Sequence, residues 1–136
     1  MGNWYGTARS NYVRVKDAGA FRVWAATLPG VDVVQKGETF ALLVSLNSHT
    51  GGWPTEREGE IEPGHAREID VGQEIVSHLV PGEVFIFCEC GAEKLRYLTG
   101  WATAVDDTGR MLHISIEDIY ALVRKRWKRT PTLAIY

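Results

Sequence analysis

The fold is decided by residues 12–46, YVRVKDAGAFRVWAATLPGVDVVQKGETFALLVSL. Residues 12–16 alternate between apolar and polar side chains, and a period of two is typical of a half-buried strand. From Asp17, a residue type that often caps helices, apolar side chains instead recur every three or four positions. This spacing predicts a helix over residues 17–28, which ends at Pro29-Gly30 because proline and glycine rarely continue a helix.

Two further strands complete this stretch. Residues 31–36 and 39–46 are rich in β-branched, aromatic and other apolar side chains, and a glycine-containing turn at 36–38 separates them. Outside the stretch, the same criteria predict three more strands and two more helices. These are strands at 84–90, 97–105 and 111–114, and helices at 71–80 and 116–128.

Capping patterns precede both later helices. Asp70 is placed to cap the first, with Gln73 in the reciprocal position. Ser115 and Asp118 form a similar pattern before the second. In order, the predicted elements are βαββαβ and then ββα, which predicts a single α+β domain over residues 1–136 with a ferredoxin-like core and a mainly antiparallel sheet. The extra hairpin would extend the sheet, and the last helix would pack against it.

Composition and charge limit the classes of function. The chain of 136 residues is 45% hydrophobic and 24% charged, as in ordinary globular domains, and has no apolar run long enough to span a membrane. Residues 1–123 hold ten basic and seventeen acidic residues, a net charge of −7, whereas 124–136 hold five basic residues and no acidic one. This asymmetry argues against a nucleic-acid surface on the acidic body and leaves only the basic end as a candidate.

An acidic comb lies within the longest loop that the sequence predicts. Residues 47–68 show no periodicity and are rich in glycine and proline. If the segment is extended, the comb lies on one face and can dock on a basic groove of a nucleic-acid-binding protein. The alternative is a mobile, solvated loop. The comb consists of Glu56, Glu58, Glu60 and Glu62.

The basic end interleaves five cations with the indole of Trp127. One interpretation is phosphate contact, with Trp127 stacking on a base. The other is that the cations lie favourably at a helix C-terminus and that Trp127 completes a buried apolar stripe. The position of Trp127, four residues after Val123, favours the second interpretation. The five cations are Arg124, Lys125, Arg126, Lys128 and Arg129.

The N-terminal segment is polar and aromatic. Trp4 and Tyr5, with Arg9 nearby, have the residue types that stack on a base or bind a loop of a partner protein. The alternative, which we favour, is an edge strand whose rings cover the sheet.

Neither a cofactor nor a metal is predicted. Cys88 and Cys90 flank one residue of a strand, so we expect two reduced thiols buried in the core and no metal bound. Two cysteines give no disulfide framework, which favours the cytoplasm. No nucleophile, metalloprotease or phosphate-loop motif is present, and His113 and the two cysteines are the best catalytic candidates that remain. We therefore expect a protein that is not an enzyme.

Several motifs carry a family resemblance. They are NWYGTARSNY at 3–12 with Val15-Lys16-Asp17, and AEKLRY at 92–97 with Gly100. These stretches resemble small uncharacterised proteins of plasmids, phages and other mobile genetic elements of bacteria, and more broadly plasmid-borne ferredoxin-like domains. Small acidic proteins of such elements often disable host defences, as anti-CRISPR and antirestriction proteins do. The resemblance therefore implies an inhibitor that binds a host nucleic-acid-handling protein through its acidic surface. The alternative is a nucleic-acid-binding accessory protein that uses the basic end.

Overall fold

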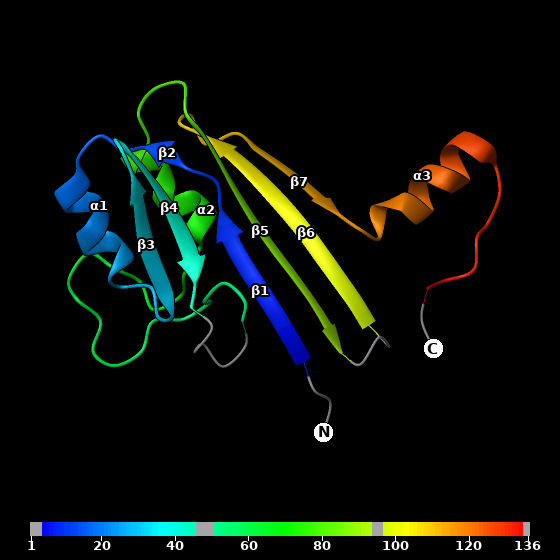
Figure 1. Ribbon diagram of the computed structural model, residues 1–136, viewed down its shortest axis with the longest axis horizontal. Coiled ribbons are helices and arrows are strands. Elements are labelled where there is room, and N and C mark those ends of the chain that lie inside the picture. Colours follow the sequence, from blue (N-terminus) through cyan, green and yellow to red (C-terminus); the bar gives the residue numbers. More distant parts are fainter. Residues whose placement is uncertain (1–3, 46–50, 94–96, 135–136) are drawn as a thin grey trace.

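The protein has one seven-stranded sheet and, among the residues described, three α-helices (Figure 1). The computed structural model describes residues 4–45, 51–93 and 97–134. All recorded strand pairs are antiparallel, which confirms an α+β protein with a mostly antiparallel sheet. The strands are β1 (Trp4–Ser10), β2 (Val13–Arg14), β3 (Val31–Lys36), β4 (Thr39–Val44), β5 (Val84–Glu93), β6 (Tyr97–Asp106) and β7 (Met111–Ser115). The helices are α1 (Ala18–Ala25), α2 (Val71–Ile75), which continues as the 3₁₀ turn η1 (Val76–His78), and α3 (Asp118–Trp127).

β1 is an internal strand, so the expected edge strand at the N-terminus is wrong. It pairs along its length with β5 and, at Arg9, with Leu43 of β4. β2 also pairs with β4, along the edge opposite β3, and the sheet continues from β5 through β6 to β7. Because β1 contains polar residues, its sequence does not indicate that the strand lies in the middle of the sheet. Ser10 is buried because its hydroxyl oxygen accepts the N–H of Leu42 at 2.9 Å, which satisfies the polar group inside the sheet.

Most predicted strands are confirmed, and one is shorter than predicted. The strand expected at 12–16 contains only Val13 and Arg14, because the chain then turns from β4 towards η1. There the N–H of Lys16 donates to the carbonyl oxygen of His78 at 2.9 Å. Residue 46, the end of another predicted strand, lies outside the described residues.

The two helices of the core start at the predicted caps. The Asp17 carboxylate accepts the N–H of Ala20 at 2.9 Å, and the Asp70 carboxylate accepts the N–H of Gln73 at 3.1 Å. The reciprocal partner at Asp70 is Glu74, which accepts the Asp70 N–H at 3.0 Å, and not the predicted Gln73. Both helices are shorter than predicted, and the second gives way to the 3₁₀ turn η1.

The core lies between one face of the sheet and the helices α1 and α2. Alternate residues of the strands supply it, as expected for a sheet with one covered face. Its largest fully buried side chains are Phe21, Leu42, Ile75, Leu79 and Phe85.

The opposite face of the sheet is open over β5, β6 and β7. Cys88 and Cys90 lie on this face and are exposed, so the prediction of buried thiols is wrong. Both are free cysteines. Phe85 and Phe87 take the positions of β5 that face the core, and the alternate residues, which include the thiols, therefore point away from it.

α3 does not pack against the sheet as expected. It follows the last strand, β7, and extends away from the body, and none of its residues is buried (Figure 1). Ile116, Ile119 and Tyr120 at its start line a pocket of about 420 Å³ with Leu98 of β6, whereas Trp127 in its last turn is 70% exposed. No described helix has the length and apolar character needed to cross a membrane.

Candidate functional site

An acidic lobe, residues 53–70, covers part of the core face, and a close approach of two backbones fixes where it begins. Gly51 has a positive φ, and a Cβ at this position would lie 2.2 Å from the carbonyl oxygen of Gly6 in β1. Beyond it, the N–H of Trp53 donates to the Glu89 carboxylate at 2.8 Å, and the indole N–H donates to the Cys88 carbonyl at 3.0 Å. The lobe is therefore attached to β1 and β5 at its first residues.

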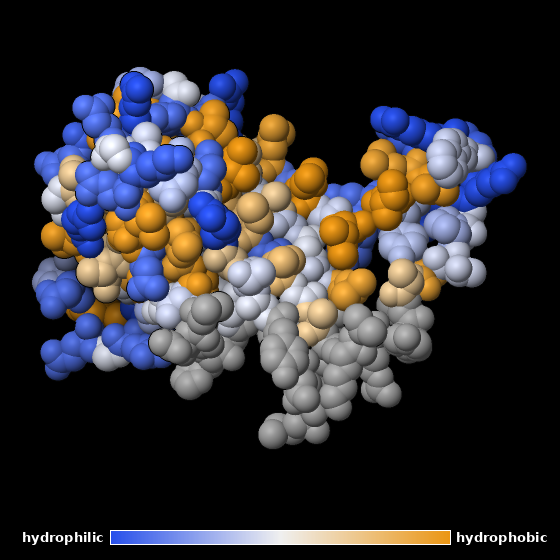
Figure 2. Space-filling view, viewed as in Figure 1, coloured by the Kyte–Doolittle hydropathy of each residue, from blue (hydrophilic) through white to orange (hydrophobic). Residues whose placement is uncertain are grey.

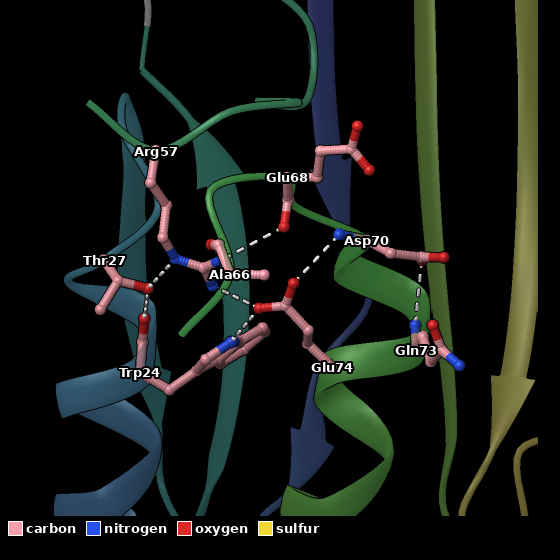
Figure 3. Close-up of polar contacts among 8 residues, drawn as sticks. All are labelled: Trp24, Thr27, Arg57, Ala66, Glu68, Asp70, Gln73 and Glu74. Atoms are coloured by element: carbon pink, nitrogen blue, oxygen red, sulfur yellow. Dashed lines mark hydrogen bonds and ion pairs between the residues drawn. The ribbon is translucent and has the colours of Figure 1, made fainter. Parts of the chain in front are cut away.

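Arg57 holds the middle of the lobe to the core (Figure 3). The residue is only 5% exposed, although it lies in the most acidic segment of the sequence. Its Nε donates to the Thr27 hydroxyl at 3.1 Å, and its Nη1 donates to the carbonyl oxygens of Ala66 at 2.7 Å and Glu68 at 3.4 Å. Its Nη2 forms an ion pair with Glu74 of α2. One guanidinium thus joins both arms of the lobe, residues 53–57 and 66–70, to Thr27, which follows α1, and to Glu74 of α2.

Glu74 is the counter-charge and has further donors. Its carboxylate also accepts the indole N–H of Trp24 at 3.0 Å and the N–H of Asp70. Burial raises the pKa of Glu74, but the hydrogen bonds from Arg57, Trp24 and Asp70 and the charge of Arg57 outweigh it. The pKa of this carboxyl therefore lies below its ordinary value, and Glu74 is ionised at neutral pH.

The two arms of the lobe also bond to each other. The N–H of Arg57 donates to the Arg67 carbonyl at 2.7 Å, and the N–H of Ile69 donates to the Thr55 carbonyl at 2.9 Å. The Arg67 side chain donates back to the Arg57 carbonyl at 3.0 Å. Backbone and side-chain bonds therefore order a segment that has no helix and only a single β-bridge.

The four glutamates of the comb are exposed, and no ion pair joins them to another described residue. The extended comb is nevertheless wrong, because the chain bends at 59–60. Glu56 bridges to Glu68 through the backbone, while Glu58, Glu60 and Glu62 gather around a cavity of about 300 Å³ near His65. The acidic residues therefore surround the tip of the lobe.

A larger groove is lined by residues of the lobe, of α1, of α2 with η1, and of β5 and β6. It is open, has a volume of about 1280 Å³, and contains no lysine or arginine among its described lining residues. Four acidic residues and three tryptophans line it: Glu68, Asp70, Glu74 and Glu89, and Trp24, Trp53 and Trp101. Glu89 also accepts the indole N–H of Trp101 at 3.3 Å. Carboxylates beside aromatic faces are suited to lysine and arginine side chains, which gain both an ion pair and a cation–π contact.

The N-terminal candidates are spread along β1. Trp4 pairs with Glu93 and Tyr5 with Ala92, at the far end of β1 from Arg9. A separation of four or five strand residues is about 13–17 Å, so the backbone of Arg9 lies well away from the backbone of Trp4 and Tyr5. The guanidinium of Arg9 instead lies 5.9 Å from the centre of the Tyr12 ring.

The basic residues lie at the other end of the molecule, on and just after α3. All five are exposed, and no ion pair joins them to another described residue. The preference for a buried Trp127 is therefore overturned, and an indole stands exposed among five cations. This cluster consists of Arg124, Lys125, Arg126, Lys128 and Arg129.

The remaining chemical candidates do not form a common centre. His113 shares a 2.7 Å hydrogen bond with Thr103, and its ring lies 5.7 Å from that of Trp101, on the core side of the sheet. Cys88 and Cys90 lie on the opposite face. Among the described residues, no group of three or more histidine, cysteine, aspartate or glutamate side chains is placed to hold a metal ion.

Sequence reasoning missed the groove because it treated the comb as isolated from the core. Two signals were present. Arg57 is a lone cation between glutamates, and Gly51-Gly52 directly before Trp53 is typical of a close backbone approach. No local pattern marks Glu89, which stands between the two cysteines of β5.

No protein-family model matches the chain, and no curated protein or solved structure is significantly similar to it.

Proposed function

We propose that the protein is not an enzyme and that it binds a host nucleic-acid-handling protein through the acidic lobe and its groove. The observation that carries the proposal is the groove, with four carboxylates and three tryptophans and no lysine or arginine among its described lining. Proteins that bind nucleic acid present lysine and arginine side chains, and these fit such a lining. Occupying that surface would exclude the nucleic acid and inhibit the host protein.

The expected setting is the cytoplasm of a bacterium that carries a mobile genetic element. The resemblance of the N-terminal motif to proteins of plasmids and phages supports an anti-defence inhibitor, similar in action to anti-CRISPR or antirestriction proteins. The acidic body, with a net charge of −7 over residues 1–123, supports attraction to a protein that binds phosphate backbones.

We also propose that the core is ferredoxin-like. In support, β4 lies between β3 and the pair β1–β2, and β1 in turn adjoins β5. If β1 and β2 count as one interrupted strand, this is the strand order of a βαββαβ core. β6, β7 and α3 are then additions at its edge.

The test begins with capture from a nuclease-treated bacterial lysate and continues with association rates for the captured protein. A matched pair of variants, Glu60→Lys/Glu62→Lys in the lobe and Asp32→Lys/Glu38→Lys on and next to β3, changes the total charge equally. We expect the lobe variant to slow association roughly tenfold at low salt, and the β3 variant to change it much less. Equal rates for the two variants and the parent would overturn the proposal.

A second candidate function is nucleic-acid binding through α3. The exposure of Trp127 among five exposed cations favours it, because an indole in that setting is free to stack on a base. Reversing Lys125 and Lys128 would then abolish a salt-sensitive affinity for single-stranded DNA or RNA. If capture from lysate is lost on nuclease treatment, this candidate replaces the first.

A further inference from the structure

The edge strand β7 is unusually open and apolar. Leu112 is 77% exposed and Ile114 is 66% exposed, and no charged residue occurs between Arg110 and Glu117. Among the described residues, β7 pairs with β6 alone, so no strand covers its other edge; at its end, the N–H of Ser115 donates to the Asp118 carboxylate at 2.7 Å. A hydrophobic edge strand of this kind is a template for pairing with another strand.

The opposite end of the sheet is protected differently. There β3 (VDVVQK) carries Asp32, Gln35 and Lys36, all exposed. Charged side chains on an edge strand discourage pairing with a second chain. The two edges of one sheet thus differ in chemistry, and only β7 lacks this protection.

α3 leaves the end of β7 at an angle (Figure 1). Figure 2 shows a hollow between α3 and the rest of the molecule, with hydrophobic residues along β7 and on the side of α3 that faces the hollow. Ile119 and Leu122 of α3 are 56% and 43% exposed. A strand that pairs with β7 would therefore meet an apolar helix as well as a free strand edge.

The chain exposes more surface than a compact monomer of its mass. Its accessible surface is 9473 Å². A folded monomer of this mass is expected to expose roughly 7,100 Å², so the excess is roughly 2,400 Å². A partner in an interface of standard size buries about 800 Å² of its own surface, and obligate dimers bury more. The excess is ample for a stable interface.

We propose that β7 pairs antiparallel with β7 of a second copy, and that each α3 packs against the partner copy. The antiparallel pairing of a strand with its own copy has a two-fold axis, so the assembly closes as a dimer and does not grow into a fibre. Charge also favours a second copy as the partner, because each basic α3 would approach a partner body with a net charge of −7. This interface is separate from the acidic lobe and does not depend on the function proposed for it.

The first test is the mass in solution, measured by sedimentation velocity from about 0.1 to 100 µM, a range that brackets ordinary dimer affinities. We expect the parent chain to be a dimer at the upper concentrations. Leu112→Lys/Ile114→Lys should weaken the dimer at least about 100-fold, since both side chains enter the interface. The control Val23→Lys replaces a side chain that is 69% exposed on α1, and it should leave the dimer unchanged. A parent chain that stays monomeric throughout would overturn the proposal, whatever else the surface binds.

The second test keeps the proposal falsifiable if the lysine variant does not fold, as judged by circular dichroism. In a Cys88→Ser/Cys90→Ser background, single cysteines are placed at positions 112, 113 and 114. Residues opposed across an antiparallel pair have Cα atoms about 4.5–5.5 Å apart, which is within disulfide range. At least one position should therefore form a covalent dimer on mild oxidation, while the control Val23→Cys should not. A dimer that none of the three β7 positions can cross-link would overturn the β7 interface.

Discussion

The two ends of the sheet use apolar residues in opposite ways. At the end of β4, α1 and α2, side chains such as Phe21 and Ile75 are completely buried. At the end of β7 and α3, no described residue of either element is buried, although both sequences are as regular in pattern. The comparison teaches that hydrophobic periodicity predicts an element and the direction of its apolar face. It does not predict whether that face meets the same chain.

The largest effect is expected at the buried end. Phe21→Ala should lower the free energy of unfolding by about 3–5 kcal/mol, since it removes a ring packed against Trp24 and Phe40. Val23→Ala, on the same helix, should cost less than about 1 kcal/mol because Val23 is exposed. Urea unfolding at one protein concentration measures both. Similar losses for the two variants would show that the two faces of α1 do not differ as described.

The next effect concerns the lobe that covers this end. Arg57→Ala should cost about 2–4 kcal/mol, because it leaves Glu74 without its counter-charge and two carbonyl oxygens without this donor, a loss that the partial exposure of Glu74 moderates. Arg67→Ala removes an exposed guanidinium that also donates to carbonyls, and should cost less than about 1 kcal/mol. The same urea titration ranks them, and the reverse order would contradict the anchoring role of Arg57.

A smaller effect is expected from pH, again at the buried end. Burial and the nearby charge of Lys16 lower the pKa of His78, whose ring stacks on Trp24. The unfolded chain therefore takes up the proton first as the pH falls through about 6.5, and stability declines, by under about 1 kcal/mol given solvent screening. The lowered pKa of Glu74 predicts a further decline below about pH 4.5. His78→Phe should abolish the first decline and keep the second, as measured by unfolding midpoints across pH.

The smallest effect is expected on the open face. Cys88→Ser and Cys90→Ser should each change the free energy of unfolding by less than about 0.5 kcal/mol, because both thiols are exposed. In the native parent chain, both should react with a thiol reagent as fast as in the unfolded chain, within about tenfold. If the thiols react only after denaturation, this face of β5 is not open to solvent as described.

Local chemistry in the sequence predicted the elements better than their packing. The caps at Asp17 and Asp70 and the strands at 31–36 and 84–90 could be recognised because their signals lie within a few residues. The central place of β1 could not, since its polar residues are satisfied by partners 30 or more residues away.

The sequence predicted the acidic charge of the candidate site but not its groove. The acidic residues of the lobe are visible in the sequence, but the groove depends on contacts between segments that lie far apart in the chain. Arg57 meets Thr27 and Glu74, and Trp53 meets Glu89, through hydrogen bonds that span 17 to 36 residues. No short-range pattern encodes such contacts. The same limit explains why Trp127, which matched a buried stripe in spacing, is exposed.

The close approach of Gly51 to the backbone of Gly6 limits where residues of the lobe can be substituted or inserted. A side chain there would collide with the Gly6 carbonyl, whereas an added Cβ at Gly59 or Gly64, near the tip of the lobe, would meet no atom within 4 Å. Inserted residues should therefore be tolerated at the tip and rejected at the base. A peptide tag placed between Pro63 and Gly64 would report on the lobe while leaving the path of the chain across β1 intact.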